Sequence, residues 1–151
     1  MSLRSLALAG AAALLAACSE STAPAGVTMQ SVAGSYSAAP ATAGGSAFGA
    51  LTFTTTATGA TTDQLASGAR LQLTLAPGGA TSGRLVIPDD GAEEGLDADL
   101  AGTWTLSGTT VRLQHAADTF LRDMPLTASG NQLTGDATFS GVRVRLVMQR
   151  P

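Results

Sequence analysis

Few residues of this 151-residue chain are of a type and spacing that could do chemistry. His115 is the only histidine and Cys18 is the only cysteine. An enzyme of the serine hydrolase class would place His115 in a cleft with an acid and a hydroxyl, but the sequence contains no Gly-x-Ser-x-Gly elbow. A zinc site would need more histidine or cysteine ligands than the chain offers. We therefore expect no enzymatic activity and no cofactor, and we interpret His115 as a rim or core residue.

The one candidate for metal binding is an acidic stretch that holds six of the eleven acidic residues. Carboxylate oxygens are ligands that calcium prefers. The glycine and ligand spacing of the stretch does not match an EF-hand loop, however. A solvated acidic loop explains the composition more simply, so we predict no metal site. The weak calcium candidates are Asp89, Asp90, Glu93, Glu94, Asp97 and Asp99.

The chain starts with a segment that has the features of an export signal. Arg4 supplies a positive charge, and Leu6–Ala17 is apolar but shorter than the roughly 20 residues of a membrane-spanning helix. Leu15, Ala16, Ala17 and Cys18 follow one another and resemble the bacterial lipobox. The resemblance implies that residues 1–17 are a lipoprotein signal peptide. An ordinary secretory signal with a chance cysteine is the alternative.

The lipobox resemblance also implies how the mature protein is held. Cys18 would carry a diacylglyceryl thioether and usually an acylated amino group, and these acyl chains would anchor the protein to a membrane. Ser19 stands where aspartate commonly retains Gram-negative lipoproteins in the inner membrane. The expected location is therefore the bacterial cell envelope, at the outer membrane and facing the periplasm. With one cysteine, no intramolecular disulfide can form.

The composition favours a single β domain behind a flexible tether. Residues 18–30 are mostly small and polar and are predicted to be the lipidated cysteine and the tether, and residues 31–151 the domain. Only 13% of residues are charged, and the eight basic residues are outnumbered by eleven acids. This balance excludes the basic patch that nucleic-acid binding needs.

Period-two alternation of apolar and polar residues predicts an all-β fold of eight or nine strands. The clearest element is a hairpin over Leu100–His115. A turn at Gly108-Thr109 would place Trp104 opposite Leu113. Short hairpins of this kind favour an antiparallel up-and-down barrel, with a two-sheet β-sandwich as the alternative. The other predicted strands are 32–36, 48–56, 70–76, 83–87, 124–127, 132–139 and 142–149, and 57–68, 89–99 and 116–122 are predicted connections.

Two Gly-x-aromatic segments, Gly34-Ser35-Tyr36 and Gly102-Thr103-Trp104, resemble those of lipocalin-like small barrels in bacterial lipoproteins. The resemblance implies an apolar interior that can take a small hydrophobic ligand. The candidate ligand or core residues are Tyr36, Trp104, Leu106 and Leu113. In the alternative, these side chains simply fill the barrel, and the protein is a structural or partner-binding envelope module. An exposed patch near Val147 or Phe120-Leu121 would then serve protein partners, whose identity the sequence does not give.

Overall fold

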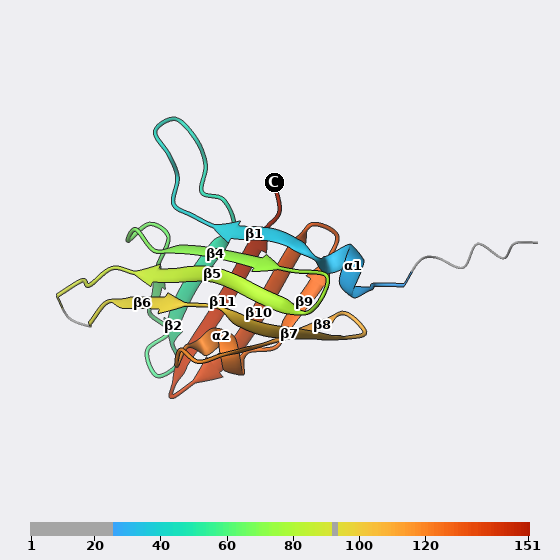
Figure 1. The fold of residues 1–151 in the computed structure, drawn as a ribbon. Coiled ribbons are helices and arrows are strands. Elements are labelled where there is room, and N and C mark those ends of the chain that lie inside the picture. Colours follow the sequence, from blue (N-terminus) through green and yellow to red (C-terminus); the bar gives the residue numbers. More distant parts are fainter. Residues whose placement is uncertain (1–25, 92–93) are drawn as a thin grey trace, which may run out of the picture.

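A computed structural model describes residues 26–91 and 94–151, and these residues form an antiparallel β-barrel with two short helices (Figure 1). The helices are α1 (Met29–Val32) and α2 (Phe120–Asp123). The strands are β1 (Gly34–Ala38), β2 (Ala50–Thr55), β3 (Thr61–Asp63), β4 (Arg70–Leu75), β5 (Ala80–Ile87), β6 (Leu96–Asp99), β7 (Gly102–Ser107), β8 (Thr110–His115), β9 (Leu126–Ser129), β10 (Gln132–Phe139) and β11 (Val142–Gln149).

Eight of these strands close the barrel, in the order β1, β4, β5, β7, β8, β9, β10 and β11. Closure is made where Ser37 of β1 lies opposite Gln149 of β11. β2 and β3 extend the sheet from β11, and β6 is added to β5. The prediction of an all-β, antiparallel barrel is confirmed.

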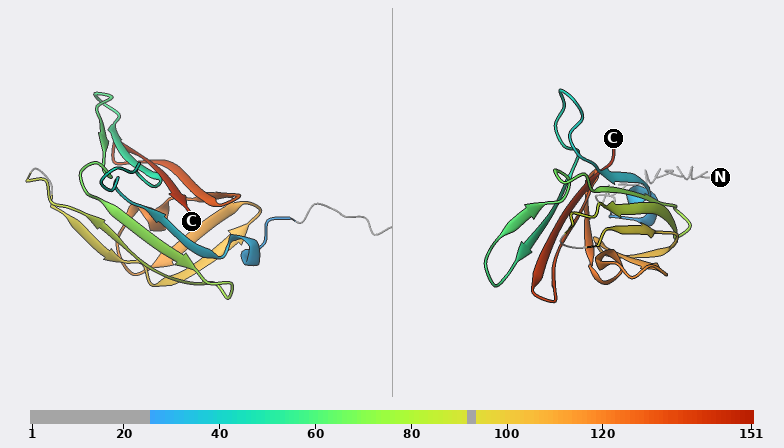
Figure 2. Two further views of the ribbon diagram at one scale, coloured as in Figure 1. Left: turned by 90° about the horizontal axis from the view of Figure 1, so that it is seen from above. Right: turned by 90° about the vertical axis from the view of Figure 1, so that its left-hand side faces the viewer.

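Two of the strand junctions that close the barrel are paired at only one of its ends. β8 pairs with β9 through only two residues, Thr110 and Val111, and β1 pairs with β11 through Ser37 alone. These pairings lie at the end that carries α1, which we call the closed end. Towards the opposite end, the open end, the strands separate into two leaves, visible in Figure 2. One leaf contains β1, β4, β5, β6, β7 and β8, and the other contains β9, β10, β11, β2 and β3.

The inward side chains explain the register of the strands. On β4, Leu71, Leu73 and Leu75 are buried, whereas Gln72 and Thr74 are exposed. Each buried leucine removes apolar surface from water, worth about 25 cal/mol for each Å². A slip by one residue would turn all three leucines to solvent, so the alternation fixes which face of the strand points inward.

The predicted β7–β8 hairpin is confirmed in its register. Trp104 lies opposite Leu113, and Leu106 lies opposite Val111. Gly108 has a φ of +60°, and positive φ at the first central residue alone is what a type II′ turn requires. Glycine at this position therefore sets the pairing of the two strands.

Two predicted boundaries differ from the structure at the start of the domain. The first strand begins at Gly34 and not at Val32, because Val32 is the last residue of α1. α1 starts at Met29, within the segment that we assigned to the tether. Thr28 and Ser31 form a capping box that satisfies backbone donors at its start.

The predicted loop over residues 89–99 is wrong for its last four residues, which form β6. Leu96 and Ala98 face the interior opposite Ile87 and Leu85. The dense acids hid a short period-two pattern, since Asp97 and Asp99 occupy the outward positions. The connection predicted over 57–68 likewise contains β3, and the strand predicted at 124–127 is β9 at Leu126–Ser129.

Candidate binding site at the open end of the barrel

The closed end is filled by the rings of the two Gly-x-aromatic segments. Tyr36 and Trp104 are each only 2% exposed. The Tyr36 hydroxyl donates a 2.6 Å hydrogen bond to the carbonyl of Val32 in α1. The Trp104 indole Nε1 donates a 2.8 Å bond to the carbonyl of Ala76. Both rings thus have their polar atoms satisfied by backbone, as buried aromatic residues usually do.

Arg150 links α1 to the closed end of the barrel through hydrogen bonds. Its guanidinium Nη1 donates to the carbonyls of Ser31 at 3.2 Å and Ala33 at 2.9 Å. Nη2 donates to the carbonyl of Gly130 at 3.0 Å. The same guanidinium lies 5.3 Å from the centre of the Tyr36 ring, within cation–π range. No sequence pattern pointed to Arg150, because its partners are backbone atoms from distant segments.

The middle of the barrel is occupied by its own side chains. Leu113, predicted as a ligand or core residue, is buried against the other inward residues, and Leu106 is half-buried. The neighbouring inward residues Leu133, Leu146 and Met148 are also buried. An eight-stranded barrel is narrow enough for side chains alone to fill it.

At the open end, inward-facing apolar side chains become partly exposed. Cross-strand pairing places Phe53 beside Val144 and Phe139 beside Val142 on the second leaf. Ile87 lies opposite Leu96 on the first leaf. We define the apolar mouth as the half-buried residues Phe53, Ile87, Leu96, Phe120, Phe139 and Val142, all packed against the core.

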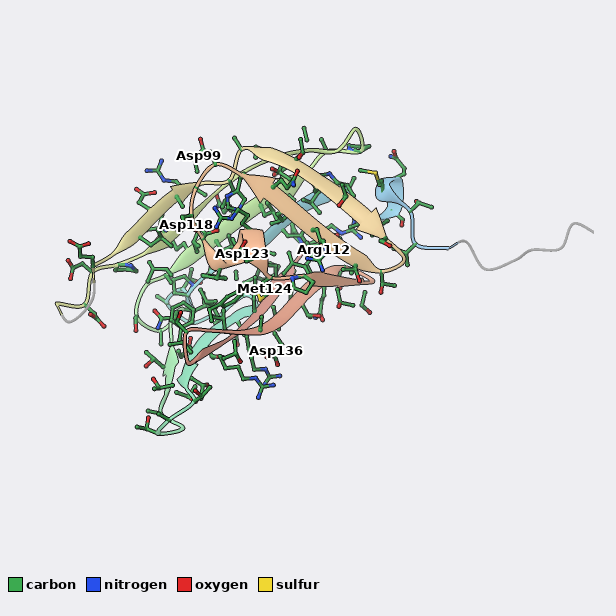
Figure 3. All side chains as sticks on the ribbon, turned by 90° about the horizontal axis from the view of Figure 1, so that it is seen from below. Asp99, Arg112, Asp118, Asp123, Met124 and Asp136 are labelled. Atoms are coloured by element: carbon green, nitrogen blue, oxygen red, sulfur yellow. The ribbon has the colours of Figure 1, made fainter. Side chains whose placement is uncertain are left out.

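The α2 segment, residues 116–124, crosses the gap between β8 and β10 at the mouth. Beyond Gly135, β10 has no partner on β9, and the segment covers this interval. Met124 is buried, and a Cβ at Gly135 would come within 2.6 Å of its Cε atom. Figure 3 shows Met124 next to Asp123, at the end of α2. The absent side chain at Gly135 therefore makes room for the segment.

In the described residues, one aromatic contact joins α2 to the second leaf at the mouth. The rings of Phe53 on β2 and Phe120 on α2 are 5.8 Å apart and nearly perpendicular, at 86°. This edge-to-face arrangement is a favourable one for aromatic pairs. The partner-binding alternative predicts an exposed patch at Val147 or at Phe120-Leu121, but Leu121 is buried and Phe120 is half-buried against the core.

A small cavity of about 70 Å³ opens beside Phe53, Ile87 and Pro88. It is bordered by the acidic connection between β5 and β6, at Asp89 and Glu94. A water molecule takes up about 30 Å³ of liquid, so the cavity has the size of about two waters. The mouth therefore presents apolar surface, but this cavity is too small for a ligand.

The acidic candidates for calcium do not converge in the described part of the chain. Arg84 binds both carboxylate oxygens of Asp97, each at 2.6 Å. Asp89 and Asp99 accept hydrogen bonds from the backbone of Gly91 and Ala101. Among residues 26–91 and 94–151, no group of three metal-ligating side chains is found. Glu93 lies outside the described residues.

The hydrogen bond from Arg84 has an electrostatic consequence for its partner. The guanidinium holds the pKa of the Asp97 carboxyl below its ordinary range. Asp97 therefore keeps its charge at mildly acidic pH.

His115 lies beneath α2. It is 9% exposed, and its Nε2 atom is 3.4 Å from the hydroxyl of Thr119. Its Nδ1 atom is buried and has no hydrogen-bond partner among the described residues. A hydroxyl thus approaches the imidazole, but no carboxylate orients it as a catalytic triad requires. The absence of enzymatic activity stays a prediction.

A wide depression on the outer wall lies apart from the mouth. It encloses about 680 Å³ over β2, β8, β9, β10 and β11, and four of its lining residues are threonines. Val147 is half-buried within it, beside Ala50. Asp136 and Arg145 lie at its edge and form an ion pair at 3.4 Å. This groove, and not a protruding apolar patch, is what the structure places at Val147.

Comparison with known protein families, with curated proteins and with solved structures found no match for this chain. Among the described residues, no helix is long and apolar enough to cross a bilayer. The lipobox residues, including Cys18, lie outside the described residues. The barrel is compatible with the lipocalin-like resemblance at the level of the fold.

Proposed function

We propose that this chain is a lipid-anchored envelope protein whose barrel binds a small hydrophobic ligand at the apolar mouth. The observation that carries the proposal is the gathering of six half-buried, apolar side chains at one end of the barrel. The other end is filled by Tyr36 and Trp104. Ligand sites are mostly apolar and concave, and the mouth is where this barrel offers inward apolar surface.

The place of the mouth relative to the tether supports this proposal. The described chain enters the barrel through α1 at the closed end, whereas the β5–β6 connection and the mouth lie at the opposite end (Figure 1). A protein held by Cys18 would therefore present the mouth on the side away from its point of attachment. A ligand could reach the mouth without passing the anchor.

A second candidate is a partner-binding envelope module with a filled core. The outer groove around Val147 favours it, since this groove is larger than the cavity at the mouth. Its threonines and the Asp136–Arg145 pair would suit a polar protein surface. The two candidates differ in whether an apolar small molecule binds.

Binding of the neutral probe N-phenyl-1-naphthylamine to residues 19–151, which include every strand, tests the first candidate. We expect saturable fluorescence enhancement. Phe139→Ala should weaken binding by about tenfold, since about 1.4 kcal/mol of apolar contact is lost. Val27→Ser is the matched control, because Val27 is 43% exposed outside the mouth. Absence of saturable binding, or equal loss in the control, would contradict a ligand site here.

Mass spectrometry of the mature protein from a bacterial host tests the anchor. We expect removal of residues 1–17 and a mass increase on Cys18 equal to a diacylglyceryl group plus an acyl chain. Cys18→Ser should retain residues 1–17 and abolish the mass increase. An unmodified Cys18, or cleavage at another bond, would contradict the lipoprotein proposal.

A further inference from the structure

The mouth must widen before it can hold a ligand. Its cavity is about 70 Å³, whereas ligand pockets usually enclose about 300–1,000 Å³. The inference that follows therefore rests on the proposed ligand site. The element best placed to move is the α2 segment, because it joins the leaves without forming strand pairs of its own.

Few backbone bonds hold α2 in place. Within it, Arg122 N–H donates to the carbonyl of Thr119 at 3.1 Å, and Met124 N–H donates to that of Phe120 at 2.9 Å. Thr119 is the N-cap residue, yet its side chain makes no capping hydrogen bond. Its hydroxyl lies instead near the imidazole of His115. The helix thus lacks a stabilising N-cap hydrogen bond, and its N-cap residue contacts His115 instead.

The surroundings of His115 suit the neutral imidazole and not the charged one. From α2, the charged groups that act on it are Arg122 and Asp123, whose effects oppose each other. Arg122 is already paired with Asp118 at 2.6 Å and with Asp123 at 3.1 Å. From β7, the residue opposite His115 is Gly102, which carries no charge. A protonated imidazole would therefore be buried with no carboxylate bonded to it.

We propose that His115 and α2 form a proton-operated gate. Protonation of the buried imidazole releases α2 from the gap between β8 and β10, separates Phe120 from Phe53 and widens the mouth. In the open state the imidazolium is hydrated, and both of its N–H groups donate to water. The proton thus favours the open conformation because only that conformation solvates the charge.

The sign of the pH dependence follows from burial. Desolvation holds the pKa of His115 below its ordinary value of 6.5, reinforced by Arg122 and opposed by the nearby backbone of Ala117 and by Asp123. The closed state therefore binds fewer protons than the open state. The closed-to-open ratio is highest above about pH 6.5 and falls by up to about tenfold for each unit below it. The fall ends at the pKa of the closed state.

Neighbouring carboxylates do not produce this response. Hydrogen bonds from Arg122 and Arg143 hold the pKa values of Asp123 and Asp136 below their ordinary range. These groups therefore stay ionised between about pH 5 and 7. Within that interval His115 is the side chain of this region that changes charge.

Hydrogen exchange of residues 19–151 at pH 7.5 and pH 5.5 tests the gate without a ligand. We expect protection factors at the Arg122 and Met124 amides to fall about tenfold at pH 5.5, while β10 and β11 keep theirs. His115→Gln keeps a polar group near Thr119 but cannot be protonated, so it should abolish the fall. Asp118→Asn is the matched control, because it removes an exposed acid beside α2 and should leave the fall intact.

The outcomes separate the gate from the proposed ligand site. Loss of protection that persists in His115→Gln overturns the gate, as does loss that vanishes in Asp118→Asn. A pH-dependent opening without probe binding supports the gate and contradicts the ligand site. Probe binding that is equal at both pH values supports the ligand site and contradicts the gate.

A direct titration covers the case in which His115→Gln fails to fold. His115 is the only histidine, so its imidazole proton signal in an NMR spectrum needs no assignment. An apparent pKa below 6.5, with α2 signals shifting in step, supports the gate. A value at or above 6.5 overturns it.

Discussion

Replacing Trp104 with alanine should lower the free energy of unfolding by about 3–5 kcal/mol, the range for truncating a large buried aromatic side chain. Trp104 is 2% exposed, so its removal leaves a cavity at the closed end. It also removes the 2.8 Å hydrogen bond that the indole Nε1 donates to the carbonyl of Ala76. Domains are stable by about 5–15 kcal/mol, so this one change removes a large share. Urea unfolding followed by circular dichroism measures it.

Trp104→Phe is the matched variant for this experiment. Phenylalanine keeps most of the buried apolar area and loses the indole N–H, so we expect a smaller loss of about 1–2 kcal/mol. The difference between the two variants separates packing from the hydrogen bond. A loss below about 1 kcal/mol for Trp104→Ala would contradict the description of the closed end as densely packed.

Gly102→Ala should lower the free energy of unfolding by about 3 kcal/mol or prevent folding. A Cβ at this position would fall on the carbonyl oxygen of Gln114 and lie 3.0 Å from the Cα of His115. These are backbone atoms of the paired strand β8, so β7 and β8 would have to separate. Overpacking of this kind usually lowers stability by about 1–3 kcal/mol, and more where backbone must shift.

Gly78→Ala is the control for Gly102→Ala. Gly78 lies in the turn between β4 and β5, and nothing stands within 4 Å of the position its Cβ would take. Its substitution should change stability by no more than about 0.5 kcal/mol. Thermal unfolding of the three proteins in parallel measures both effects. Equal stability of Gly102→Ala and the parent chain would show that the strands do not approach as closely as described.

The hairpins could be predicted because their information is local. Alternation around Trp104 and Leu113, with glycine at the turn, gives both the face and the register of β7 and β8. The same reasoning gave β10 and β11 with the boundaries observed. In each case the partner strand lies only a few residues away along the chain, so that pattern and turn type suffice.

Features that depend on distant segments could not be predicted in this way. The division into two leaves follows from pairings such as Val147 of β11 with Ala50 of β2, which are remote in sequence. The contact of Phe53 with Phe120 depends on the path of the α2 segment across the gap. Phe53 was identifiable as an inward residue, but the position of the open end was not. Phe53 and Phe120 come together only once the whole barrel has formed.

The acidic stretch shows how composition can mislead. Six acids in eleven residues suggested a solvated loop, yet Asp97 is an outward residue of β6 bonded to Arg84 on β5. The Arg84–Asp97 pair lies on the outer face of the sheet, so it does not prevent Leu96 and Ala98 from packing on the inner face. A four-residue strand is too short for its alternation to stand out against such a density of charge.

The bonds of Arg150 have a mechanical consequence for a protein held by its N-terminus. A pull on the tether reaches the domain at α1, where Arg150 grips the carbonyls of Ser31 and Ala33. The same side chain holds Gly130, and its own backbone N–H is bonded to Asn131, both at the β9–β10 turn. Arg150 therefore links the segment before β1 to the end of β11 and to the β9–β10 turn, so that a force on α1 is shared among these elements at the closed end. A force applied at the N-terminal side of α1 would therefore act first on the closed end and not on the mouth.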